Sequence, residues 1–279
     1  IIATTIVAAV ADNGINSPYS RYGLGILADQ NMGVNRQMGG LGYALRSGSY
    51  INLLNPASFA AADTLTMLFE AGFSLQNVNF KEGNVQKNAK NGSFDYLAMQ
   101  FRAGRNIGIS IGFLPYSNVG YSFATTTKEG GKESTSNYNG EGGIYQPYIG
   151  VGWSPVKDLS VGLMMSYMYG DISHTIYNDF TESNITDMQR QYLLNVRSYK
   201  IDLGAQYTTT LANKHKITFG ATYSLGHNLN ADAIKIEKYT LSDTTKINGT
   251  FKLPHSIGLG TLYNYNDNWK VGLDYTFQD

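Results

Sequence analysis

Histidine, the side chain that most often acts as a general base or a metal ligand, is scarce in this sequence. It occurs at four positions: His174, His215, His227 and His255. No two of them have the spacing of a shared metal site, and the chain has no Cys to supply thiolate ligands. No nucleophile motif supports a hydrolase, although the sequence leaves open a Ser–His pair formed across strands. The sequence predicts no metal, no cofactor and no enzymatic activity.

Two short motifs near the N-terminus have residue types that occur in binding sites. Gly39-Gly-Leu-Gly42 is not followed by the Lys-Ser/Thr of a phosphate-binding loop. We expect Gly39, Gly40 and Gly42 to permit close packing. Asn55-Pro-Ala57 is predicted to form a turn, in which the Asn side chain caps the following residues and Pro56 fixes φ. A direct role in substrate binding is the alternative for Asn55, Pro56 and Ala57.

Three arginines lie in the first fifty residues, at Arg21, Arg36 and Arg46. We expect them to pair with carboxylates on the strands that follow, such as those of Glu70, Asp202 and Asp274. The alternative is that they hold the carboxylate of a bound ligand, which guanidinium geometry suits. The formal net charge is zero and the pI is about 7.1, so the sequence does not predict a nucleic-acid partner.

The elements that must position these residues are strands. From residue 64 onward, apolar and polar residues alternate with the period of two that is typical of half-buried strands. Nine segments show it, at about 64–75, 93–104, 106–127, 142–154, 158–172, 196–211, 215–229, 252–266 and 268–279. One face is apolar and ends in Tyr or Trp, while the other carries Gly, Ser and Thr.

Composition indicates that the apolar face does not face water. Charged residues make up 15% of the chain, against about 25% in an ordinary soluble protein. A soluble β-sandwich is the alternative, but such a polar inner face would leave its core underfilled. We therefore predict an all-β fold, a transmembrane antiparallel up-and-down β-barrel whose apolar face contacts outer-membrane lipids.

The connections between the nine segments alternate in length. Those at 104–106, 154–158, 212–215 and 266–268 are short, whereas those at 80–92, 128–141, 173–195 and 230–251 are long and polar. This is typical of barrels with short periplasmic turns and long outer loops. Nine strands do not close an even-numbered barrel, so we expect the barrel to be incomplete at its C-terminal end.

The N-terminal sixty residues divide into two parts. Residues 1–11 are apolar and end in the A-x-A pattern of a cleavage site, so we interpret them as the remnant of a secretory signal peptide. An apolar first strand is the alternative. Residues 12–63 are rich in Gly and Asn with weak periodicity, which predicts a compact plug. Residues 64–279 form the predicted barrel.

The third segment contains a defect. Ile107, Ile109, Ile111 and Phe113 alternate with small residues, then Pro115 interrupts the pattern and the alternation resumes in a new phase at Val119. Proline cannot donate to a strand ladder. The defect is either an edge bulge or a gap in the barrel wall.

The Gly-rich stretch, the Asn-Pro-Ala motif before the first strand and the break at Phe113-Leu-Pro115 together resemble the FadL/TodX family of outer-membrane transporters of hydrophobic compounds. The resemblance implies a fourteen-stranded barrel, of which about nine strands are present, with an N-terminal hatch. It implies a lateral gate at a kink in the third strand, here Phe113, Leu114, Pro115, Tyr116, Ser117, Asn118 and Val119. The segment beginning at Ser17-Pro-Tyr departs from the transporter pattern, so a divergent subgroup is expected.

The expected function is passive uptake of hydrophobic small molecules, such as long-chain fatty acids, across the outer membrane of a Gram-negative bacterium. Phe59, Met164, Met168 and Leu262 are the expected ligand-binding residues, and the last three interrupt the polar face. The alternative function is a barrel that does not transport but serves as a structural partner of envelope proteins in an assembly or secretion complex.

Overall fold

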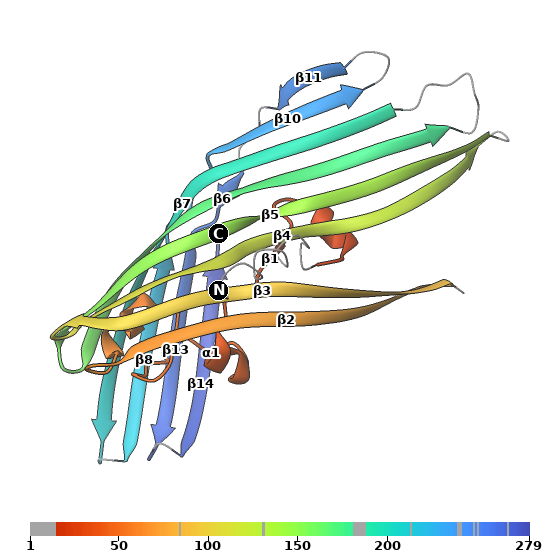
Figure 1. Ribbon diagram of the computed structural model, residues 1–279. Helices are drawn as coiled ribbons and strands as arrows, with labels where there is room; N and C mark the ends of the chain where they lie inside the picture. The colour runs from red at the N-terminus through yellow and green to blue at the C-terminus, as the bar shows by residue number, and fades with distance from the viewer. Residues whose placement is uncertain are drawn as a thin grey trace, which may run out of the picture.

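The chain forms one large antiparallel sheet (Figure 1). The computed structural model describes residues 15–83, 85–129, 132–180, 188–212, 214–238, 242–247, 249, 251–266 and 268–279. The predicted signal peptide, residues 1–11, lies outside them. Neighbouring strands run in the order β14-β13-β8-β7-β6-β5-β4-β3-β2. Their bounds are β2 Met67–Glu82, β3 Val85–Gly104, β4 Ile107–Glu129, β5 Lys132–Val156, β6 Leu159–Phe180, β7 Met188–Leu211, β8 His215–Ser224, β13 Ser256–Tyr265 and β14 Trp269–Gln278.

These nine strands confirm the predicted all-β, antiparallel fold. Shorter strands accompany them: β1 Ile26–Leu27, β9 His227–Asn228, β10 Ala231–Lys238, β11 Ser242–Ile247 and β12 Lys252–Leu253. The β10–β11 hairpin pairs with β7 and widens the sheet at one end. In the described part of the chain β2 pairs only with β3 and β14 only with β13, so the sheet has two free edges.

The prediction of long outer loops is wrong for all four long connections, since the fourth, residues 230–251, contains the β10–β11 hairpin. Residues 80–92, 128–141 and 173–195 lie largely in strands; the β4–β5 ladder, for example, continues to the Glu129–Lys132 pair. The sequence pattern disappears there because Ser, Thr and Asn occupy both faces, while the backbone keeps its pairing. Period-two alternation reports a difference in polarity between two faces, not the strand itself.

The outer face of the sheet carries a band of exposed apolar side chains. At one end of this band an aromatic row crosses five strands, formed by Phe73, Phe94, Phe113, Tyr145 and Tyr169, whose neighbouring ring centroids lie 5.5–6.1 Å apart. At the other end stand exposed aromatic residues such as Trp153 and Tyr207. Tyr145 and Trp153 are eight residues apart on β5, or about 26 Å at about 3.3 Å per residue.

The nine residues from Tyr145 to Trp153 match the roughly 9–11 residues with which a tilted strand crosses a bilayer. Leu163 and Met165 lie within the band, exposed at 41% and 50%. No helix in the described ranges has the length and apolar character needed to cross a membrane.

Beyond the aromatic row the polarity of the two faces reverses. The inner side chains become apolar and buried: Val119, Ile144, Ile172, Leu194 and Val196 form a cluster that Leu229 and Leu253 complete. The outer face there carries residues such as Asp171 and Asn195, whose side chains bond to one another. A sheet in water buries its apolar side chains in this way, so the aromatic row marks where the lipid-facing region ends.

The N-terminal segment, residues 15–63, lies inside the curve of the sheet (Figure 1). It contains the 3₁₀ helix η2 Pro18–Arg21, strand β1, helix α1 Gly33–Gln37 and the 3₁₀ helix η3 Pro56–Ala61. A second buried cluster joins this segment to the sheet through Met32, Ile51, Leu53 and Phe59 on one side and Tyr96, Tyr148 and Met164 on the other.

Candidate functional site

Helix η3 sits on a row of glycines that crosses four strands. This glycine row consists of Gly108 on β4, Gly152 on β5, Gly162 on β6 and Gly204 on β7, and each is the direct register partner of the next. A Cβ at Gly162 would meet the backbone of Pro56 and Ala57, and one at Gly108 would meet the carbonyl of Phe59. Because backbone atoms cannot rotate away, only glycine permits this approach.

Asn55 joins η3 to both the N-terminal segment and the sheet. Its Oδ1 accepts from the N–H of Ala57 at 3.0 Å and caps the helix, as the sequence predicts. Its Nδ2 donates to the carbonyl oxygens of Tyr43 at 2.7 Å and of Ala205 at 3.2 Å. The side chain is fully buried, so these bonds are shielded from competing water.

Two more buried asparagines hold the fold of the segment itself. Asn52 donates to the carbonyls of Gly42 and Leu45 at 2.7 and 2.9 Å, and it accepts from Asn35 at 3.0 Å. Gly39 and Gly40, at the end of α1, have φ of +71° and +91°, which glycine adopts without strain. Gly42 packs directly against Leu54, consistent with a packing role for the Gly cluster.

Carboxylates on the sheet bind the segment mainly through its backbone, not through the arginines that the sequence suggested. Asp274 accepts from the N–H groups of Gly42 and Tyr43 at 2.7 and 2.9 Å, and Glu70 accepts from the N–H of Ile51 at 2.8 Å. Asp202 pairs with Lys200 instead. The three carboxylates named as examples were wrong, because loop N–H groups inside the sheet require acceptors as much as arginines do, whereas the expected pairing of an arginine with a strand carboxylate is confirmed for Arg36 and Asp95.

The three arginines have separate environments. Arg36 pairs with Asp95 at 2.7 Å and with Asp29 at 3.1 Å. Arg21 lies over the ring of Tyr138 at 4.4 Å. Arg46 donates to the hydroxyl of Ser154 at 3.1 Å, and burial lowers the pKa of its guanidinium from the ordinary value.

Replacing Asp274 by alanine is expected to loosen the contact between β14 and the segment. The change removes the acceptor of two charge-assisted hydrogen bonds at a half-buried position. We expect it to lower the free energy of unfolding by about 1–3 kcal/mol. Thermal unfolding in detergent measures the loss. Asp243→Ala, on the exposed strand β11, is the matched control and should leave the midpoint unchanged; equal midpoints for both variants would contradict the prediction.

Pro115 marks the point where β4 leaves β3. The β3–β4 ladder ends at the Leu97–Phe113 pair, and the β4–β5 ladder shifts register between Pro115 and Ser117. Beyond this point β3 and β4 diverge (Figure 1). Both sequence alternatives therefore describe part of the geometry, since there is a bulge toward β5 and a separation from β3. The predicted gate, residues 113–119, lies at the start of this separation, and its role as a gate stays a prediction.

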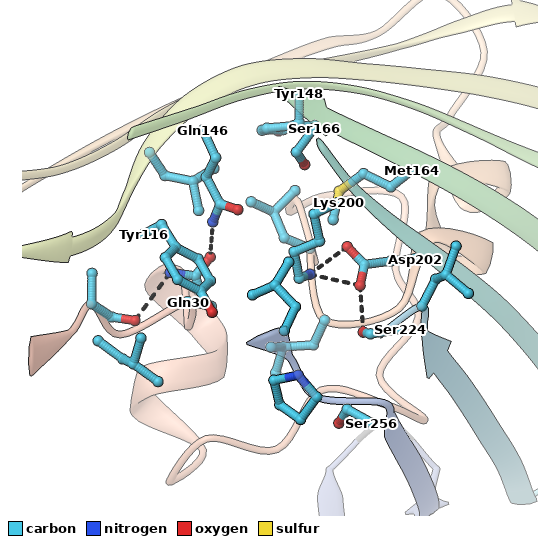
Figure 2. Close-up of a pocket in the computed structure, with 18 of the residues that line it drawn as sticks. Gln30, Tyr116, Gln146, Tyr148, Met164, Ser166, Lys200, Asp202, Ser224 and Ser256 are labelled. Atoms are coloured by element: carbon cyan, nitrogen blue, oxygen red, sulfur yellow. Dashed lines mark hydrogen bonds and ion pairs between the residues drawn. The ribbon is translucent and has the colours of Figure 1, made fainter. Parts of the chain in front are cut away.

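A small cavity lies between the segment and the strands at this level (Figure 2). Its volume is about 240 Å³, and Leu114, Tyr116 and Met164 contribute to its wall. Its polar side holds Lys200, which donates to Asp202 at 2.6 Å, and Gln146, which donates to Gln30. The only charged residues of the wall, Lys200 and Asp202, are paired with each other.

The predicted ligand-binding residues do not share one site. Phe59 and Met164 belong to the cluster under η3, Met168 to the cluster beyond the aromatic row, and Leu262 to a third cluster with Ala44 and Leu45. Of the four, only Met164 lines the cavity of Figure 2. Across the described ranges, no three His, Asp or Glu residues gather as metal ligands.

The glycine row is the feature that sequence reasoning missed. Its four members were recognised only as residues of the polar face, because their alignment across strands depends on register. A partial sequence signal exists: the short turn at 154–158 would have aligned Gly152 with Gly162. The other two pairs, Gly108–Gly152 and Gly162–Gly204, lie across connections that were predicted to be long, so their registers could not be counted.

A family model described as BamG matches residues 1–279. No curated protein and no solved structure matches the chain. The match corrects the expected resemblance to the FadL/TodX transporters, since the family that matches the whole chain is a different one.

Proposed function

Because the chain belongs to the BamG family, we propose that it is an outer-membrane β-barrel protein that serves as a structural partner in β-barrel assembly. The family name suggests a connection with β-barrel assembly. This function corresponds to the scaffold alternative considered from the sequence, and it replaces fatty-acid uptake as the leading hypothesis. The outer membrane is the compartment that the apolar outer band fits.

The observation that carries this proposal is that packing and hydrogen bonds hold the N-terminal segment in place against the sheet. Helix η3 rests on the glycine row, and Asn55, Asp274 and Glu70 bind the segment to β7, β14 and β2. A transport path would require this segment to move or to leave a channel beside it. The cavity of Figure 2, about 240 Å³, is smaller than the roughly 300–1,000 Å³ of ligand pockets, whereas two more open hollows of about 560 and 680 Å³ lie elsewhere, so the proposal rests on the packing of the segment and not on cavity size.

The strands beyond the aromatic row supply the surface for envelope partners. There β4–β7 and the β10–β11 hairpin form a sheet with its own buried cluster. A barrel that only anchors itself in lipid does not require a packed layer outside the membrane. We place the contacts with other assembly proteins on this layer.

Depletion of the protein in its native host tests the proposal. We expect the levels of several unrelated outer-membrane β-barrel proteins to fall at least several-fold, as measured by quantitative mass spectrometry of outer-membrane fractions, because a missing assembly partner affects many barrels. Uptake of a fluorescent fatty acid is measured in parallel on the same cells at an early time point.

The two measurements separate the alternatives. Unchanged barrel levels together with lost uptake would overturn the proposal and favour transport. Complementation with the wild-type gene should restore the barrel levels, which excludes a secondary effect of the depletion itself.

A further inference from the structure

The outer part of β4 has a free edge. From Leu114 to Glu129 this strand pairs with β5 on one side, whereas its pairing with β3 stops at Phe113. On the freed side the only strand partner within the described ranges is β1, which is paired antiparallel through Ile26–Asn118 and Leu27–Ser117. A strand edge of this kind presents unpaired N–H and C=O groups to any extended chain.

The N-terminal segment already uses the first part of this edge. Ala28 donates its N–H to the carbonyl of Tyr116 at 2.9 Å, and Ser17 donates to the carbonyl of Gly120 at 2.9 Å. The N–H of Gly120 donates to the hydroxyl of Ser20 at 3.1 Å. Even-numbered residues of β4 therefore direct their backbone groups to the free side. An antiparallel extended chain is the ligand that this edge accepts.

The segment's hold on this edge is short. Between its two contact points Ser20 is buried and bonds to Gly120 of β4, whereas Tyr19, Tyr22 and Leu27 are exposed at 80%, 72% and 61%. Leu24 packs against the buried cluster beside the edge, so removal of residues 17–28 must break this apolar contact and the bonds of Ser17, Ser20 and Ala28. Local opening of this kind requires less free energy than global unfolding.

The rest of the edge, residues 121–127, is open and unprotected. Among the residues described, no strand pairs with it on the β3 side. Its sequence Tyr-Ser-Phe-Ala-Thr-Thr-Thr has high β propensity and contains neither charge nor proline. The outer strand β11, Ser-Asp-Thr-Thr-Lys-Ile, carries charged side chains, which usually prevent an exposed edge strand from pairing with another chain. The β4 edge lacks that protection.

The inner face beside this edge is aromatic. Tyr121 hydrogen-bonds to Nδ1 of His174 at 2.8 Å, and Phe123 stacks on Tyr138 with ring centroids 5.0 Å apart. A strand paired with this edge would place alternate side chains next to these rings. Apolar or aromatic residues at every second position fit that face, and polar residues fit the side toward water.

We propose that the outer edge of β4 is a docking site for an extended segment of a second protein, with alternating apolar residues, which binds along residues 121–127 and then replaces residues 17–28 of this chain. The inference rests on the proposed function, because the strands of barrels under assembly have this alternating pattern. The recognition itself is strand addition, in which backbone bonds give affinity and alternate side chains give specificity.

A matched pair of substitutions at Ala124 tests the edge. The N–H of Ala124 faces the free side, so Ala124→Pro removes one donor to an incoming strand without removing a donor from the β4–β5 ladder. Ala124→Val keeps the N–H and serves as the control. The probe is a fluorescent peptide with the sequence of residues 269–278, WKVGLDYTFQ, and binding to the purified full-length protein in detergent is measured by anisotropy. We expect at least tenfold weaker binding to Ala124→Pro than to Ala124→Val.

A disulfide tests the replacement of the segment. The chain has no cysteine of its own, and Ile26 and Asn118 are direct register partners. Cross-strand partners have the Cα separation that a disulfide requires. The variant Ile26→Cys/Asn118→Cys, when oxidised, should bind the peptide at least tenfold more weakly, and a reductant should restore the affinity.

Three results would overturn the inference: equal affinity of Ala124→Pro and Ala124→Val, equal affinity of the oxidised and reduced disulfide variant, or equal affinity for a scrambled peptide that lacks alternation. Each leaves the proposed function standing if depletion still lowers barrel levels. Conversely, strand binding without an effect of depletion would retain the docking site and reject the assembly role.

Discussion

Gly162→Ala is expected to release the N-terminal segment from its seat. The added Cβ would lie against the backbone of Pro56 and Ala57, which cannot move unless η3 lifts from the sheet. Overpacking in a well-packed site destabilises by about 1–3 kcal/mol, so the population with an undocked segment should rise by about 5-fold to 140-fold. Limited trypsin digestion after Arg46, which is largely shielded in the docked state, reports this population as a cleavage rate.

Gly104→Ala is the matched control. Gly104 is also a strand glycine, at the end of β3, but a Cβ there meets no atom within 4 Å. The cleavage rate of this variant should equal that of the wild type. Resistance of Gly162→Ala to trypsin would show that the glycine row tolerates a side chain and that η3 packs less tightly against the row than its geometry indicates.

Asn55→Asp is expected to destabilise the docked segment more than Gly162→Ala does. The substitution keeps an acceptor for the N–H of Ala57 but replaces the donor to the carbonyls of Tyr43 and Ala205 by a buried carboxylate oxygen. A charge buried beside carbonyl oxygens without a partner is strongly unfavourable. Asn55→Ala loses the cap, about 1 kcal/mol, and leaves buried carbonyls unpaired, about 1–3 kcal/mol.

Thermal unfolding in detergent, followed by Trp fluorescence, should rank the proteins wild type, Asn55→Ala and Asn55→Asp in order of falling midpoint. Asn77→Ala, an exposed asparagine on β2, controls for the loss of an amide and should match the wild type. If Asn55→Asp unfolds at the wild-type temperature, the buried bonds of Asn55 do not hold the segment.

Much of the fold could be predicted from the sequence because the lipid-facing band imposes a strict polarity difference. In β6, Val161, Leu163 and Met165 alternate with Ser160, Gly162 and Met164, and the structure exposes the first three on the outer face as expected. The sequence also correctly predicted that the alternation changes phase after Pro115, since Phe113 faces outward and Val119 is buried on the inner face. Where both faces of a strand are polar, as in residues 128–141, this signal is absent and the strand was missed.

The site was less predictable, because it depends on contacts between distant parts of the chain. The pairing of Asp274 with the backbone of residues 42 and 43 joins opposite ends of the sequence. The family was also misread from motifs that have a general physical cause. A Gly-rich stretch, an Asn-Pro turn and a proline at a ladder break are common solutions for fitting a segment inside a sheet. They describe a packing problem and not a transport activity.

The reversal of polarity at the aromatic row has a consequence for the surrounding bilayer. Below the row, outward positions such as Leu163 and Met165 require acyl chains, whereas a few residues further along the same strand Asp171 requires water. The protein therefore cannot adapt to a thicker or thinner membrane by shifting vertically. Hydrophobic mismatch must instead be relieved by the lipids, which thin or thicken locally at a modest free-energy cost for each ångström. A rim of deformed lipid around this protein would itself favour neighbours with the same hydrophobic height, and such sorting would bring barrels together before any protein–protein contact forms.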